Sequence, residues 1–135
     1  MPIMNWNDTL DVGVEAMNDE HKGILDAMNA IYDRAKEGVT GDEINALVGK
    51  LGDVTVKHFA DEEAFMQKKG FPEFETHKRL HTKLLDRFAK EAEAIKDAGG
   101  VVSDDFFNFL RFWLGSHIRG IDKKYGDHAN GEKAA

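Results

Sequence analysis

The sequence predicts an all-α protein, an up-down-up-down antiparallel four-helix bundle with an extended N-terminal arm. Apolar residues recur three and four positions apart over four long stretches, a spacing that gathers them on one face of a helix. Glycines fall between these stretches, and the only prolines, at positions 2 and 72, lie outside them, so nothing breaks a helix within one. Because the joining segments are short, successive helices are expected to be antiparallel neighbours.

The composition is that of an ordinary folded domain. Its 135 residues are 41% hydrophobic and 32% charged, which fits a packed core beneath a charged surface. We expect a single domain over residues 1–135, with the arm over 1–17, the bundle over 18–119 and a C-terminal segment over 120–135.

Charge and residue usage argue against several classes of partner. The net charge of -7 disfavours nucleic acid and an anionic membrane surface, because both attract basic patches. No apolar run approaches the roughly 20 residues needed to cross a bilayer, so membrane insertion is not expected. Cysteine is absent, which removes disulfides and thiolate metal sites. Since the N-terminus shows no signal-peptide pattern, we expect a cytoplasmic location.

A change in apolar spacing separates the arm from the first helix. The apolar residues of 1–17 lack helical spacing and are predicted to be extended, whereas Asn18 or Asp19 is predicted to cap the first helix. The apolar side of this helix is formed by His21, Ile24, Leu25, Met28, Ile31 and Tyr32. Gly38 and Gly41 bracket the first turn.

Asp42 begins the second predicted helix. Its inward side is formed by Ile44, Leu47, Val48, Leu51, Val54, His58, Glu62, Phe65 and Met66. Gly52 lies within this helix at a cost of about 1 kcal/mol relative to alanine. Either a neighbouring helix approaches closely there or the glycine is simply tolerated, and the sequence favours neither explanation.

Gly70 and Pro72 separate the second helix from the third, and Gly99 ends the third. The seam of the third helix is formed by Phe74, His77, His81, Leu84, Phe88, Ala92 and Ile95. Ser103 is predicted to cap the fourth helix, whose inward residues are Phe106, Leu110, Trp113, Leu114 and His117. Three more phenylalanines widen its apolar surface, and we expect some of them to cover the arm: Phe107, Phe109 and Phe112. The polar tail from Lys123 is expected to fray.

Five of the six histidines fall at seam positions of these helices. A lone histidine on an apolar face is more often a hydrogen-bonded core residue than a metal ligand. Five of them together with Glu62 would each need a buried partner, and the seams contain almost no Ser, Thr, Asn or Gln. A shared metal centre would satisfy all of them at once. His128 lies in the polar tail and is assigned no role.

The number of candidate ligands suggests two metal ions. Five imidazoles and Glu62 exceed the four ligands of a structural zinc site, and imidazoles with carboxylates favour iron. Asp122 is a further candidate, although on a continuous helix it would point roughly 140° away from His117. Gly120 could end the helix and let Asp122 turn back, or Asp122 could be solvated, and both interpretations stay open. Glu63 is expected to point away into solvent.

Four motifs make the chain resemble the hemerythrin family, and within it the free-standing, single-domain bacteriohemerythrins: NDEHK around His21, HFADEE, GFPEFETHKRLH and HIRGID. The resemblance extends from Trp6 through Tyr125. It implies a non-haem di-iron centre (Fe2+/Fe3+) that binds dioxygen reversibly for oxygen transport, storage or delivery. One iron would be held by His77, His81 and His117 and the other by His21 and His58. Glu62 and Asp122 would bridge them together with an oxo or hydroxo group, and the two-histidine iron would keep an open position.

Two positions depart from the family pattern. Glu20 stands before His21, where glutamine is more common, and Leu80 stands before His81, where glutamate is common. Neither residue is a ligand, so we expect altered contacts around the site rather than its loss.

Helical spacing predicts an apolar pocket beside the open iron, lined by Ile24, Leu25, Phe59, Met66, Trp113 and Leu114. Such a lining would exclude water and supply no proton donor, which favours a carrier over an enzyme. The same residues also fill the core, and Trp113, one turn before His117, is the strongest candidate for a pocket wall.

Two other functions are weighed against a carrier that delivers dioxygen to an oxygen-consuming enzyme. The first is a sensor of oxygen, nitric oxide or iron that uses the same di-iron site. The second is a di-iron oxidase or peroxidase of the ferritin or rubrerythrin kind, whose sites combine Glu-x-x-His motifs with further glutamates. Here the candidate ligands are five histidines and two carboxylates, so histidines outnumber carboxylates, the opposite of such enzymes.

Overall fold

The fold is the predicted four-helix bundle with an N-terminal arm. The structure, a computed structural model, describes residue 4 and residues 6–134, with side chains up to residue 128. The helices are η1 (Asp8–Leu10), α1 (Glu15–Lys36), α2 (Asp42–Lys68), α3 (Phe74–Asp97), α4 (Asp104–His117), the π-helix η2 (Ile118–Asp122) and α5 (Lys123–Ala134). The described part of the chain contains no β-strand, and none of its helices is both long and apolar enough to cross a membrane.

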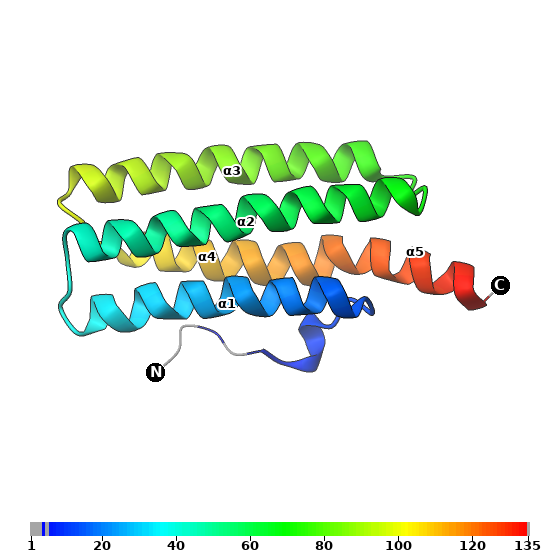
Figure 1. Ribbon diagram of the computed structural model, residues 1–135, viewed down its shortest axis with the longest axis horizontal. Coiled ribbons are helices and arrows are strands. Elements are labelled where there is room, and N and C mark those ends of the chain that lie inside the picture. Colours follow the sequence, from blue (N-terminus) through cyan, green and yellow to red (C-terminus); the bar gives the residue numbers. More distant parts are fainter. Residues whose placement is uncertain (1–3, 5, 135) are drawn as a thin grey trace.

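Helices α1 to α4 lie side by side and alternate in direction, as Figure 1 shows, and α5 continues beyond α4 toward the C-terminus. The arm runs back beside α1, where Asn29 donates a hydrogen bond to the Met4 carbonyl at 3.0 Å. At the other end of the arm, the Arg119 guanidinium donates to the Thr9 hydroxyl at 2.9 Å. The arm therefore joins α1 to the end of the bundle where α4 passes into η2.

Helix α1 begins earlier than predicted, at Glu15. The expectation that Asn18 or Asp19 caps it was wrong, because Asn18 lies within the helix and holds the arm instead. Its side-chain oxygen accepts from the Val12 N–H at 3.0 Å, and its amide donates to Asp11 at 2.8 Å. The cap of α4 is confirmed, since the Ser103 hydroxyl accepts from the Phe106 N–H at 3.3 Å.

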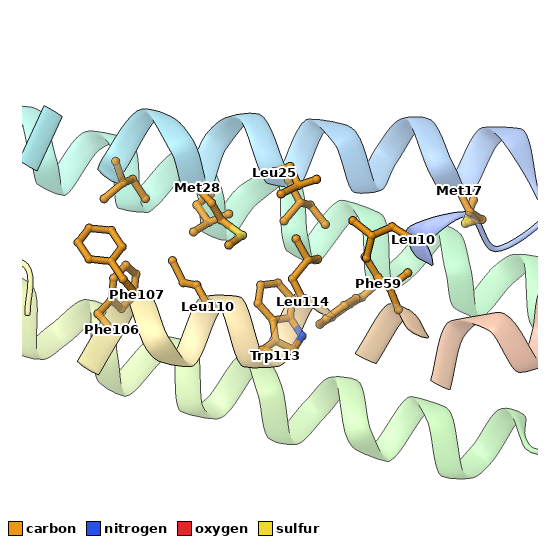
Figure 2. Packing of buried hydrophobic residues seen from close by; sticks show 14 of the residues in the cluster. Leu10, Met17, Leu25, Met28, Phe59, Phe106, Phe107, Leu110, Trp113 and Leu114 are labelled. Carbon is orange, nitrogen blue, oxygen red and sulfur yellow. The ribbon is translucent and has the colours of Figure 1, made fainter. Parts of the chain in front are cut away.

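The core fills the space between the helices along the whole bundle. In Figure 2, Phe106, Leu110 and Leu114 of α4 face the side of the core that holds Leu25 and Met28 of α1. All of these side chains are almost completely buried. Apolar burial of this kind is the main favourable contribution to folding of such a bundle.

The three additional phenylalanines of α4 differ in their surroundings, and their cover of the arm stays a prediction. Phe107 is buried against Tyr32 of α1, with ring centroids 5.0 Å apart. Phe109 is half-buried beneath the Arg87 guanidinium at 4.6 Å from the ring centroid, and Phe112 is 74% exposed. The first two broaden the bundle core, because the bundle needs apolar cover on the α1 and α3 sides of α4.

Gly52 marks a close approach of α2 to α3. A β-carbon at this position would stand 3.0 Å from the ring of Phe88 on α3. Of the two explanations that the sequence left open, the geometry therefore favours the close approach of a neighbouring helix.

The C-terminal segment is helical rather than frayed over its described backbone. The chain does not end its helix at Gly120 but passes through η2 into α5. Within η2 the Lys123 N–H bonds to the Ile118 carbonyl, five residues back, which is the hydrogen-bond pattern of a π-helix. Gly126 on α5 then lies against the arm, so close that a β-carbon there would stand 1.7 Å from the Val12 carbonyl oxygen.

We predict that Gly126→Ala destabilises the protein by about 1–3 kcal/mol, because the arm must move away from α5 to admit a methyl group. Gly49→Ala is the matched control, since an added β-carbon on this exposed α2 glycine meets no atom within 4 Å. The control is expected to stabilise its helix by up to about 1 kcal/mol. Urea unfolding of both variants measures the difference, and equal midpoints would contradict the close contact.

Candidate metal centre

The structure brings all seven predicted ligands together at one level of the bundle. Each is buried, with at most 7% of its surface exposed. They come from every helix of the bundle and from η2: His21 on α1, His58 and Glu62 on α2, His77 and His81 on α3, His117 on α4 and Asp122 on η2. Residues distant in sequence thus form one cluster of imidazoles and carboxylates.

The seven side chains form two overlapping groups. The larger contains Glu62, His77, His81, His117 and Asp122, and the smaller contains His21, His58, Glu62 and Asp122. Within each group, one ligand atom from every member lies within 4.8 Å of the others. Both carboxylates belong to both groups, so the geometry provides two adjacent positions for cations with two shared ligands.

Asp122 directs one oxygen toward each group. Its Oδ1 lies 2.9 Å from Nε2 of His77 and 2.9 Å from Nε2 of His117. Its Oδ2 lies 3.1 Å from Nε2 of His21.

Glu62 repeats this division. Its Oε1 lies 2.9 Å from Nε2 of His81 in the larger group, and its Oε2 lies 3.0 Å from Nε2 of His58 in the smaller group. Each carboxylate therefore spans the two groups as a bridging ligand would.

The donor set fits a pair of metal ions. Nitrogen and oxygen ligands about 2.1 Å from a shared ion, at right angles, are about 3 Å apart, which is the spacing found here. Nε2 of His77 stands 3.2 Å from Nε2 of His117, where two ring nitrogens converge. Both oxygens of Asp122 and Oε1 of Glu62 are buried without a hydrogen-bond partner in the described chain. Cations between these atoms would remove that desolvation cost.

The π-helix explains how Asp122 reaches the cluster. On an α-helix, a residue five positions after His117 would face away from it by roughly 140°. In η2 the hydrogen bonds span five residues, so that the wider turn brings Asp122 back to the side of His117. Asp122 is accordingly buried in the cluster rather than solvated, and the helix continues past Gly120.

Two further glutamates hold ligand histidines from outside. The Nδ1 of His58 lies 2.7 Å from Oε1 of Glu20, and the Nδ1 of His81 lies 3.0 Å from Oε2 of Glu63. The expectation that Glu63 is solvated was wrong, because its side chain reaches from α2 to α3 and is only 23% exposed. Such carboxylate partners fix the orientation of an imidazole and raise its basicity as a ligand. Glu20, one of the two departures from the family pattern, thus adds a charged contact.

Tyr125 is a site residue that the sequence reasoning missed. Its hydroxyl donates to Oε2 of Glu62 at 2.8 Å, and the side chain is 1% exposed. Burial and then the nearby carboxylates raise the pKa of Tyr125 far above its ordinary value, so the hydroxyl keeps its proton. The expectation of no proton donor beside the cluster was therefore wrong. The available signal was its position three residues after Asp122, on the same side of a helix.

The six predicted pocket residues are all buried: Ile24, Leu25, Phe59, Met66, Trp113 and Leu114. Phe59 stacks on the His81 ring, with centroids 3.8 Å apart and planes 5° apart. Trp113 meets Phe59 edge-on at 6.0 Å, and Figure 2 shows it beside Leu114 in the same layer of the core. Trp113 therefore reaches the cluster through Phe59, and the role of all six toward dioxygen stays a prediction.

The cluster binds protons tightly when it holds no cation. Burial lowers the pKa values of His21 and His77, but the adjacent carboxylates of Asp122 and Glu62 outweigh it and raise both values to about 9. Burial likewise opposes the ionisation of the carboxyl groups, yet the histidines lower the pKa of Glu62 well below its ordinary value. The pKa of Asp122 falls to about 2. The carboxylates are ionised, and protons on the imidazoles supply the opposing charge.

The fold and the cluster together define a class of protein, a four-helix bundle with a cation site rich in histidine and carboxylate. Residues 12–129 match the family described as Hemerythrin HHE cation binding domain. The chain is 36% identical over 127 residues to a bacteriohemerythrin of Methylococcus capsulatus, covering 93% of this chain and 96% of that one. A bacteriohemerythrin of Stenotrophomonas maltophilia is 32% identical, with 94% of this chain and 82% of that one covered.

Solved structures agree with these relatives. The crystal structure of a wild-type hemerythrin has a TM-score of 0.82 and 36% sequence identity to this chain, and covers 93% of this chain and 97% of that one. The chain therefore belongs to the hemerythrin family. The resemblance expected from the four sequence motifs is confirmed.

Metal binding is predicted to release protons at neutral pH. His21 and His77, with pKa values of about 9, are protonated at pH 7 and must lose these protons to bind a cation. We expect release of about two protons per cluster at pH 7, falling as the pH rises through 9. Calorimetric titration of Fe2+ without air, in buffers of different ionisation enthalpy, measures this number. His128→Gln should leave this number unchanged, and a binding enthalpy at pH 7 that is the same in every buffer would contradict the raised pKa values.

The same pKa values determine how the metal-free protein responds to pH. Because they are raised above the ordinary 6.5, these histidines stabilise the fold fully below pH 6.5 and lose that contribution as the pH rises through 9.

Tyr125→Phe is predicted to destabilise the metal-free protein by about 1–3 kcal/mol, because Oε2 of Glu62 loses a buried hydrogen-bond donor. Tyr32→Phe is the matched control, since Tyr32 packs on Phe107 away from the cluster. Urea unfolding of the two variants separates loss of the hydrogen bond from loss of a hydroxyl in general. Equal effects of the two substitutions would show that the Tyr125 hydroxyl does not stabilise Glu62.

Proposed function

We propose that this protein binds dioxygen reversibly at a non-haem di-iron centre and acts in oxygen transport, storage or delivery. The observation that carries the proposal is the unequal sharing of ligands between the two groups. Three histidines belong to one group and two to the other, while Glu62 and Asp122 belong to both. Membership of the hemerythrin family supports iron as the metal.

The proposed ligand sets follow the two groups. His77, His81 and His117 would hold one iron, and His21 and His58 the other. Glu62 and Asp122 would bridge them, together with a solvent-derived oxo or hydroxo group. Two irons held in this way would supply the electrons that reversible dioxygen binding requires, and the pair of histidines in the smaller group would leave room for the gas.

The surrounding side chains would favour release of unchanged dioxygen. Ile24, Leu25, Met66 and Leu114 are apolar and buried, and would keep water from the site. The Tyr125 hydroxyl already donates its hydrogen bond to Glu62, so it holds that side chain in place. These features support a carrier rather than an enzyme.

The setting of this function is part of the proposal. We infer a cytoplasmic protein that passes dioxygen to an oxygen-consuming enzyme. The same centre would serve a sensor of oxygen, nitric oxide or iron, which the test below distinguishes by its reversibility.

We predict a visible absorption band that appears when the reduced, iron-loaded protein meets dioxygen and fades on degassing, over repeated cycles. Trp113→Ala should retain iron and form the band, but lose it faster, because water gains access past Phe59. His77→Ala should lower the iron content by removing a ligand of the three-histidine iron.

Three outcomes would contradict the proposal. Immediate oxidation without a reversible band would favour a sensor or an enzyme. Rapid turnover of peroxide would favour the oxidase or peroxidase alternative. Full iron content and an unchanged spectrum in His77→Ala would overturn the ligand assignment.

A further inference from the structure

A small pocket opens on the surface behind His77, on the side away from the cluster. It has a volume of about 40 Å³ and is formed by the α2–α3 connection, α3, η2 and α5. Its lining residues are Phe71, Glu73, Thr76, His77, Leu80, Ile121 and Lys124. Phe71 and His77 are buried and form the inner part, whereas Glu73, Thr76 and Lys124 are exposed at the rim.

The His77 ring has one nitrogen without a partner. Its Nε2 faces the cluster, 2.9 Å from Asp122. Its Nδ1 has no hydrogen-bond partner in the described chain. This atom is buried, and the whole side chain is only 2% exposed. When Nε2 binds a metal, Nδ1 carries the ring proton and needs an acceptor. A buried N–H without one is costly, so the site is incomplete at this atom.

Other ligand histidines show what a completed contact looks like. His58 and His81 each have a carboxylate at Nδ1, from Glu20 and Glu63. His21 also has an unpartnered, buried Nδ1, but it is not among the residues that line this pocket. His21 and His77 thus each have a buried Nδ1 without a partner in the described chain, and of these two only His77 lines this pocket.

We propose that this pocket binds a water molecule that accepts a hydrogen bond from the His77 Nδ1–H. The volume is sufficient, because a water needs a cavity of about 10–15 Å³ on the same measure. The Thr76 hydroxyl at the rim offers the polar neighbour that a bound water also requires. The proposal rests on the proposed function in so far as His77 must be a metal ligand.

Charge at the pocket favours neutral water over an anion. The Lys124 ammonium at the rim lies 3.8 Å from the Glu73 carboxylate, which offsets its positive charge.

The water would make the hydrogen-bond acceptor at Nδ1 of His77 differ from that of His81 in the same group. His81 is held by a carboxylate at Nδ1, whereas His77 would be held by an exchangeable, neutral acceptor that is continuous with solvent. Its N–H would then exchange with solvent faster than that of His21, which lacks such an opening. Solvent in this pocket would thus contact His77 of the larger group without entering the cluster.

A crystal structure of the iron-loaded protein at about 1.5 Å resolution or better, grown without small carboxylate or phosphate ions, tests the site directly. We expect a water within hydrogen-bond distance, about 2.7–3.2 Å, of the His77 Nδ1. Leu80→Phe fills the pocket and should displace this water. Leu85→Phe, the same substitution elsewhere on α3, is the matched control and should leave it in place.

Proton NMR of the same samples gives a second readout. Metal-bound imidazole N–H signals are shifted by the paramagnetic iron, and their exchange with deuterium can be followed one by one. We expect one signal to exchange quickly in the natural protein and at least tenfold more slowly in Leu80→Phe, with no change in Leu85→Phe. Should Leu80→Phe fail to fold, Thr76→Leu blocks the pocket from its exposed rim and carries the same expectation.

With iron bound at His77, three results would overturn the proposal. The first is a pocket without water in which the His77 Nδ1–H bonds to a protein acceptor. The second is an anion in place of the water. The third is an imidazole N–H exchange rate that does not change when the pocket is filled. Each is read from iron-loaded protein and needs no dioxygen binding, so a failure of the proposed carrier function is recognised separately. If His77 binds no metal, the iron ligands in the crystal structure show it, and that result also overturns the proposal.

Discussion

The buried negative charge of Glu62 and Asp122 is the constraint on which the rest of the structure depends. Both carboxylates are fully enclosed at the centre of the bundle, where an uncompensated anion is very costly. The compensating imidazoles come from four different helices, so every helix must present its histidine at the same level. The packing of the apolar residues above and below the cluster fixes the position of each helix along the bundle. The site therefore assembles only when the core packs correctly.

Contacts from outside the cluster hold its members in place before any cation arrives. Glu20 and Glu63 each fix one imidazole, one in each group, and Tyr125 fixes Glu62. Metal affinity gains from such preorganisation, since fewer side-chain rotations are lost on binding. The same three groups are partners of ligands rather than ligands, and they therefore tune the site without changing its composition.

The fold and the clustering of the five histidines with Glu62 could be predicted from the sequence, because both depend on helical spacing that is local. The misses have a different physical origin. Asn18 has the chemistry of a helix cap, but a tertiary contact with the arm decides where it binds. Glu63 follows Glu62 and therefore lies on a different face of α2 from that ligand. Its long side chain nevertheless reaches His81 on α3. The π-helix depends on hydrogen-bond register, which residue types alone do not specify, so the place of Asp122 stayed open until the backbone was known.

The joining of the arm to α5 at Gly126 has a consequence for how the molecule is made. The arm precedes α5 along the chain, so the contact between Val12 and Gly126 forms only after Gly126 has emerged from the ribosome. Asp122 and Tyr125 emerge just before it. A nascent chain that has emerged only as far as Ile121 would hold five histidines and Glu62 but lack the Asp122 carboxylate and the Tyr125 hydroxyl that positions Glu62. The emergence of η2 and the first turn of α5 is therefore also the step that completes the cation site.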